Sequence, residues 1–200
     1  ADSQQSWLKT TKFSANAGQF TCLPDQNGAM GSAIVVMGKT PLWDIAKAAR
    51  DLPAGSWHPD FTFAADIAVS DIQLGWGLAQ YKFAPHKTTD TDNALPELAL
   101  SDTALCIDSS ALVLGTHIVR EMVNLPANQM TPAGIEQAAR EIAQAYSARF
   151  SVVSGEALES YAPALHVVGR AAEIRPRMIQ LLWGDSGPVI TLVGKGISFD

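Results

Sequence analysis

Cysteine is scarce in this sequence, and its scarcity excludes several classes of protein. Cys22 and Cys106 are the only cysteines in 200 residues, so the chain is not a small domain held together by many disulfides. The two are far apart and match no zinc-binding spacing. Thiols of this kind are typical of buried side chains in a protein from a reducing compartment.

Long apolar runs, a targeting segment and an excess of positive charge are also missing. No apolar run approaches the ~20 residues that a membrane-spanning helix needs. The first residues, ADSQQ, have neither the basic region nor the apolar core of a signal peptide. The net charge of -6 argues against nucleic acid as the main partner. We therefore expect a cytoplasmic protein that does not work in a membrane or on nucleic acid.

Several common catalytic motifs are absent as well. There is no Gly-x-Ser-x-Gly sequence of the serine hydrolases. A phosphate-binding loop needs a glycine at position 189 and a Ser or Thr after Lys195, but the chain has Val189 and Gly196 there. No pair of histidines has the spacing of metal ligands; the four are His58, His86, His117 and His166.

The composition is that of an ordinary globular protein, with 47% hydrophobic and 17% charged residues. Up to about residue 105 the pattern predicts a small α/β domain. Its strands are expected at 20–23 and 32–37, and its helices at 41–50 and 68–81. Thr40 is a plausible N-cap before Pro41. Trp7, Trp43 and Trp76 are expected in its core.

The pattern of apolar and turn-forming residues at 106–200 predicts the beginning of a second α/β region. A polar, turn-rich linker is expected at 84–102. Helices are expected at 111–124, 131–148 and 155–161, and strands at 150–153 and 178–183. Leu112, Thr116, Val119 and Val123 lie on one face of the first of these helices. Alternating helices and strands imply an α/β layered domain.

The last stretch, residues 188–200, is where the candidate site lies. Residues 189–193 form an apolar, β-branched run that predicts a strand buried on both faces. It ends in Gly194-Lys195-Gly196, and Asp200 follows five residues later. An amine and a carboxylate at the end of a buried strand are compatible with a salt bridge, an anion site or a metal site. As a metal ligand, Lys195 must be neutral, because an ammonium group has no lone pair to donate.

Three blocks of sequence resemble the leucyl aminopeptidases, the M17 family of two-metal peptidases. The lysine block is 194–200, GKGISFD; the asparagine block is 124–132, which contains NLPAN and then Thr131-Pro132; the arginine block is 166–179, which contains HVVGRA and RPRMI. The resemblance is specific from about residue 119 to 200. Ser198 stands where many relatives have Thr.

The resemblance implies a metal role for the lysine block. The lysine that matches Lys195 binds one metal ion, and the aspartate that matches Asp200 helps to hold both. Two divalent ions, Zn²⁺, Mn²⁺ or Mg²⁺, then bind the free amine of a peptide and activate a water. In the family two more aspartates and a glutamate complete the metal site, while a second lysine and an arginine, which holds a bicarbonate, assist catalysis. All of these would follow Asp200. No catalytic residue is therefore expected within this chain.

The resemblance also implies the architecture. It is a small macro-like N-terminal domain, here residues 1–105, followed by a larger α/β catalytic domain with a mixed sheet between helices. Residues 106–200 would be a linking helix and the first part of that catalytic domain. The expected protein is a homohexamer that releases N-terminal amino acids from peptides. The alternative is a non-catalytic macro-like module that binds a nucleotide or another protein.

Overall fold

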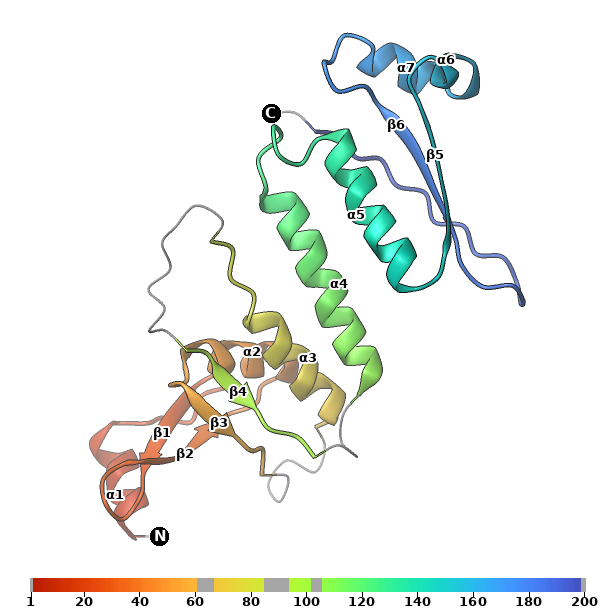
Figure 1. Ribbon diagram of the computed structural model, residues 1–200. Helices are drawn as coiled ribbons and strands as arrows, with labels where there is room; N and C mark the ends of the chain where they lie inside the picture. The colour runs from red at the N-terminus through yellow and green to blue at the C-terminus, as the bar shows by residue number, and fades with distance from the viewer. Residues whose placement is uncertain (1, 61–66, 85–93, 102–105, 199–200) are drawn as a thin grey trace. The chain divides into compact units, whose positions relative to one another are not determined.

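The computed structural model describes residues 2–60, 67–84, 94–101 and 106–198. The chain forms two compact units, Ala1–Val119 and Arg120–Asp200 (Figure 1). The border between them falls inside helix α4 (Ile107–Asn124). Both units combine helices with small sheets, which confirms the predicted α/β class. Among the described helices, none is both long and apolar enough to cross a membrane.

The first unit begins with helix α1 (Asp2–Thr10) and an antiparallel hairpin of strands β1 (Phe20–Pro24) and β2 (Met30–Val35). Both strands were predicted, whereas α1 was not. The hairpin turn is held by Asp25, whose carboxylate accepts hydrogen bonds from two backbone amides of the turn at 2.8 and 2.9 Å. Aspartate commonly stabilises a tight turn in this way.

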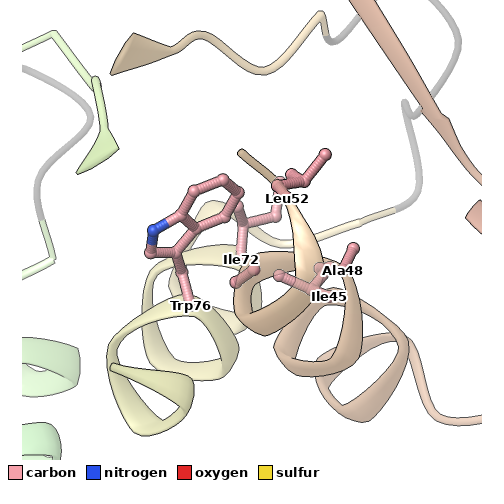
Figure 2. Packing of buried hydrophobic residues seen from close by; sticks show 6 residues of the cluster. Ile45, Ala48, Leu52, Ile72 and Trp76 are labelled. Atoms are coloured by element: carbon pink, nitrogen blue, oxygen red, sulfur yellow. The ribbon is translucent and has the colours of Figure 1, made fainter. Parts of the chain in front are cut away.

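Two helices form the core of the first unit (Figure 2). Helix α2 (Pro41–Asp51) and helix α3 (Val69–Ala79) pack through a cluster of buried side chains: Ile45, Ala48, Ala49, Leu52, Ile72 and Trp76. The sequence placed both helices correctly. Helix α2 ends where Leu52 takes an extended conformation before a proline, as the steric clash with the proline ring requires. Thr40 occupies the N-cap position, but its side chain makes no capping hydrogen bond.

Of the three tryptophans expected in the core, only one is buried. Trp76 is 9% exposed, whereas Trp7 and Trp43 are 42% and 58% exposed. Trp43 is two residues before the buried Ile45, so it points to the other side of α2. Trp7 lies against the hairpin, where its indole donates a hydrogen bond to the carbonyl of Cys22 at 3.0 Å.

A short parallel pair completes the first unit. Strand β3 (Gly55–Trp57) pairs with strand β4 (Pro96–Leu98), and the indole of Trp76 donates to the carbonyl of Pro96 at 3.1 Å. Strand β4 lies inside the stretch predicted as a linker, so that prediction was wrong at this point. Residues 85–93 and 102 of the predicted linker lie outside the described residues.

Helix α4 begins four residues earlier than predicted and turns its apolar side outward. Leu112, Val119 and Val123, which were expected on one face, are 58%, 58% and 76% exposed. The opposite side packs on α3, where Ser109 and His117 each bond to a backbone carbonyl at 3.1 Å. Helical periodicity identified the face correctly but could not tell which elements would cover it.

The second unit places helix α5 (Pro132–Ala145) on one face of an antiparallel pair, strands β5 (Arg149–Ser154) and β6 (Arg177–Leu182). Helix α6 (Ala157–Tyr161) and helix α7 (Pro163–Gly169) connect the two strands. Helix α5 and both strands were predicted, whereas α7 was not. The guanidinium of Arg140 lies 4.4 Å from the centre of the Phe150 ring, so Phe150 faces α5.

The last stretch of the chain departs from its prediction. Residues 189–193 form no strand, and Val189, Leu192 and Val193 are more than 90% exposed. A strand is defined by hydrogen bonds to a neighbour, and none of the described strands pairs with this run. The prediction of a buried strand was therefore wrong for this structure, because an apolar, β-branched sequence cannot supply its own partner.

Candidate metal site

Lys195 lies in an extended, irregular segment that follows this exposed run, and its side chain is exposed. Neither Gly194 nor Gly196 has a positive φ. The glycines are therefore not required for a left-handed turn, contrary to the simplest reason for placing them beside the lysine. Their surroundings differ: a side chain at Gly194 would meet open space, whereas one at Gly196 would meet helix α5.

The contact at Gly196 attaches the lysine segment to helix α5. A Cβ atom on Gly196 would lie 3.2 Å from Cδ1 of Ile135. That separation is shorter than ordinary van der Waals contact between carbon atoms, which is about 3.5–4.0 Å. The absence of a side chain at position 196 thus lets the backbone rest directly on Ile135.

The asparagine block builds the N-terminal end of α5. Thr131 is its N-cap, and the hydroxyl accepts a hydrogen bond from the amide of Gly134 at 3.2 Å. Pro132 takes the first helical position, where a missing N–H costs nothing. Just before the cap, the amides of Gln129 and Met130 both bond to the carbonyl of Pro126. This part of the sequence therefore fixes the helix turn that carries Ile135.

The arginine block anchors the same helix to the sheet. Glu136, next to Ile135, accepts hydrogen bonds from Arg140 at 2.7 Å and from Arg177 of β6 at 2.6 Å. The carboxylate is 19% exposed and the Arg177 side chain 22%. Arg177 also donates to the carbonyl of Arg175 at 2.9 Å, and Arg175 bonds to the carbonyl of Arg170.

The two arginines set the charge state of Glu136. The hydrogen bond from Arg140, reinforced by that from Arg177 and by both positive charges, holds the pKa of the Glu136 carboxyl below its usual range. Partial burial opposes the shift without cancelling it. The carboxylate is therefore ionised at neutral pH and forms a stable link between α5 and β6.

Of the two predicted ligands, the structure describes one. Asp200 lies outside the described residues, so the choice between a salt bridge, an anion site and a metal site is untested. Among the described residues no ion pair involves Lys195. No group of three His, Cys, Asp or Glu able to hold a metal ion occurs in the described ranges. Lys195 cannot form a metal site by itself.

Sequence reasoning missed the contact that links Ile135 to the lysine segment. Ile135 belongs to the apolar stripe of the predicted helix 131–148, and that pattern indicates burial but not a partner. The contact could have been predicted from Gly196, because the sequence around it shows no turn that would require a glycine. Such a glycine indicates close approach of another element.

The two cysteines are present as thiols, as predicted, although both are only half-buried. Burial raises the pKa of the Cys22 thiol. A thiol with a raised pKa is a weaker nucleophile and metal ligand, so Cys22 is a structural residue.

Comparison with protein families gives two matches that together cover most of the chain. Residues 1–100 match the model described as the M17 aminopeptidase N-terminal domain. Residues 117–200 match the model of the cytosol aminopeptidase family catalytic domain. The second match contains all three sequence blocks.

Curated relatives agree with both matches. A probable cytosol aminopeptidase of Stenotrophomonas maltophilia is 29% identical over 94% of this chain and 44% of its own length. One of Geobacter sp. is 31% identical over 77% of this chain and 35% of its own length. The chain thus spans less than half the length of these relatives.

Solved structures show the same fold. The cytosol aminopeptidase of Coxiella burnetii superimposes with a TM-score of 0.83 at 25% identity, covering 92% of this chain and 40% of that protein. The bottromycin maturation enzyme BotP in complex with Mn has a TM-score of 0.73 at 20% identity, covering 88% of this chain and 41% of that one.

The alternative of a non-catalytic macro-like module finds no support in these matches. Family models match residues 1–100 and 117–200, and the relatives extend across both. The chain belongs to the M17 family, the cytosol aminopeptidases.

Proposed function

We propose that this chain forms the N-terminal domain and the first part of the catalytic domain of a two-metal, leucyl-aminopeptidase-like exopeptidase. In this proposal residues 1–105 are the macro-like N-terminal domain. Residues 106–200 are the linking helix and the first part of the catalytic domain. Lys195 and Asp200 are metal ligands, and the remaining ligands lie outside this chain.

The observation that carries the proposal is the match of residues 117–200 to the cytosol aminopeptidase catalytic-domain model, because this range contains both Lys195 and Asp200. Lys195 lies between two glycines on a segment that contacts α5, and its side chain is exposed.

The roles of the two side chains follow from their chemistry. Lys195 would bind one ion through the lone pair of its neutral Nζ, and Asp200 would bind through its carboxylate oxygens. Two divalent ions, Zn²⁺, Mn²⁺ or Mg²⁺, would supply the Lewis acidity that polarises the scissile carbonyl and makes the attacking water more acidic. The exposed position of Lys195 leaves room for ligands from other segments.

The remaining parts of the proposal concern partners. The substrates are peptides with a free N-terminus, and a bicarbonate ion assists the reaction. The enzyme acts in the cytoplasm as a homohexamer. The peptide substrates and the cytoplasmic location are supported by the curated relatives, which are described as probable cytosol aminopeptidases. The bicarbonate and the homohexamer rest on the resemblance of the sequence blocks alone.

The test is Lys195→Met in the full-length enzyme, because methionine keeps the length and apolar stem but removes the nitrogen. We expect the variant to fold and to lose metal at one of the two sites, with a steep fall in activity. The measurements are metal content per chain and melting temperature with a chelator present. Lys39→Met, the same chemical change at an exposed lysine of the first unit, is the control and should bind metal normally.

The salt-bridge reading makes the opposite prediction. If Lys195 only neutralised Asp200, the variant would keep its metal but leave a carboxylate without its partner, at a cost of about 3–5 kcal/mol if buried. Unchanged metal content with a large, chelator-independent fall in melting temperature would therefore contradict the ligand role.

A further inference from the structure

The three sequence blocks, far apart in the chain, all contact helix α5 at its N-terminal end. The asparagine block caps the helix through Thr131, and the arginine block holds Glu136 through Arg177. The lysine block rests on Ile135 through Gly196. In Figure 1 the last stretch runs back along α5 towards the beginning of that helix. The first two turns of α5 and its N-cap therefore connect all three blocks.

We infer that Ile135 is a positioning residue for Lys195: its Cδ1 supports the backbone at Gly196 and so fixes how far the lysine amine stands from helix α5. The inference rests on the proposed function, because it assumes that Lys195 binds metal. It goes further by giving the contact between Ile135 and Gly196 a role in metal affinity.

The argument begins with the asymmetry of the two glycines. Neither has a positive φ, so an alanine could adopt either backbone conformation. At Gly194 it would meet nothing within 4 Å. At Gly196 it would meet Cδ1 of Ile135 at 3.2 Å, and one or the other would have to move. The position of Lys195 is therefore restricted on one side only, by the contact between Gly196 and Ile135.

Ile135 can fix the position of Lys195 only if Ile135 is itself held rigidly. Two sets of contacts hold it. Thr131 and Pro132 define the first turn of α5, and the backbone amide of Ile135 bonds to the carbonyl of Thr131 at 3.0 Å. The neighbouring Glu136 is held by two arginines at 2.6 and 2.7 Å. Ile135 thus has little freedom to follow the lysine segment if the segment shifts.

A small displacement of a metal ligand has a measurable effect. Residues that orient a ligand without touching the metal typically change metal affinity by about 10–100-fold when altered. Removing Cδ1 or adding a Cβ changes the support by a single carbon atom. We therefore expect an effect near the lower end of that range, confined to the ion bound by Lys195.

The experiment is a double-variant cycle in the full-length enzyme, with Ile135→Val and Gly196→Ala alone and together. Valine lacks Cδ1, the atom that an alanine at 196 would crowd. Gly196→Ala alone should raise the Kd for Mn²⁺ at the site to which Lys195 contributes by about 10-fold. The same change should cost much less in the Ile135→Val background. Titration calorimetry with Mn²⁺ and the Mn²⁺ electron paramagnetic resonance spectrum measure this independently of activity.

Matched variants separate positioning from general stability. Ile142→Ala removes an apolar side chain from the other end of the same helix, so we expect it to lower the melting temperature but to leave the Kd unchanged. Gly194→Ala adds a Cβ on the open side of the lysine and should bind Mn²⁺ normally.

The outcomes distinguish this inference from the proposed function. If Lys195→Met keeps both metals, the ligand role itself is wrong. If Lys195→Met loses a metal but Gly196→Ala binds normally, the ligand role stands and the positioning role is overturned. If both single variants weaken binding but the double variant shows the sum of their effects, contact between the two residues is not the cause, and the inference is also overturned.

Discussion

At the scale of single residues, two glycines explain how helix α3 packs. Gly75 and Gly77 lie inside the helix, where glycine is normally unfavourable. A Cβ at Gly75 would overlap the backbone carbonyl of Leu42 in α2, and one at Gly77 would lie 2.6 Å from the Val113 side chain of α4. Glycine lowers the intrinsic stability of α3 at these positions, but it is needed because α2 and α4 approach too closely for a side chain to fit.

Gly75→Ala should therefore destabilise the chain, although alanine is the better helix former. Overpacking against a backbone atom costs about 1–3 kcal/mol, which exceeds the roughly 1 kcal/mol that helix propensity returns. Chemical denaturation followed by circular dichroism measures the free energy of unfolding.

The matched control is Gly115→Ala in α4, where an added Cβ meets nothing within 4 Å. This variant should be neutral or more stable by up to about 1 kcal/mol. Equal stabilisation by both substitutions would show that α2 and α3 do not approach as described.

The sequence was least informative about which single residues support the candidate metal site. Lys195 and Asp200 could be proposed as metal ligands only through the resemblance of residues 194–200 to the family's lysine block, because the two side chains alone are equally compatible with a salt bridge. Ile135 could not, because nothing in an apolar helical stripe indicates which distant backbone it supports. Contacts between segments separated by sixty residues depend on how the whole unit folds.

At the scale of elements, helix α5 is the part on which the second unit is built. Its cap, its link to β6 and its support of the lysine segment all lie within two turns. The hydroxyl of Thr131, the carboxylate of Glu136 and the side chain of Ile135 each make a different contact. Changing the link between α5 and β6 therefore tests the stability of the unit without touching the lysine segment.

Glu136→Gln should make the stability of the chain less dependent on pH. The folded-state pKa of Glu136 lies below its usual value, so its stabilisation is present above that value and is lost as the pH falls through the lowered pKa. At pH 7 the variant should be less stable by about 1–3 kcal/mol, as expected for hydrogen bonds to a charged group.

Once the pH has fallen below the lowered pKa of Glu136, the difference between the two proteins should disappear, because the native carboxyl is then protonated as well. Thermal melts at several pH values check this. Glu141→Gln is the control on the same helix, where the carboxylate bonds to the neutral side chain of Gln137 at 2.9 Å. A pH profile unchanged by Glu136→Gln would contradict the role of the two arginines.

Elements were predicted well where the local signal was strong. Thr131 with Pro132, and the proline that follows Leu52, marked helix ends that the structure confirms. Strand β4 and helices α1 and α7 escaped prediction because they are short or lie in polar sequence. The run 189–193 was misjudged for another reason: composition indicates that a segment suits a strand, but only a neighbour makes it one.

At the scale of the whole molecule, the chain joins two units that match separate family models. The described residues of neither unit contain a cluster of metal-ligating side chains. With Lys195 and Asp200 as ligands, the chain supplies only part of a site for two ions.

We therefore expect the isolated chain to be inactive. Hydrolysis of a leucine chromogenic amide by the refolded 200 residues, with Mn²⁺ added, should not exceed that of a sample lacking protein. Far-ultraviolet circular dichroism verifies that the sample is folded. Sustained turnover proportional to chain concentration would show that the missing ligands are supplied within these residues.

The exposed run at 189–193 has a consequence for how such a sample behaves. Its backbone groups pair with none of the described strands, its side chains are mostly apolar and β-branched, and it carries no charge. Sequences of this kind favour strand pairing between separate molecules. Two copies of the isolated chain can thus adhere through this run as its concentration rises. Association seen in such a sample would then reflect strand pairing between these five residues of separate chains and not the assembly of the enzyme.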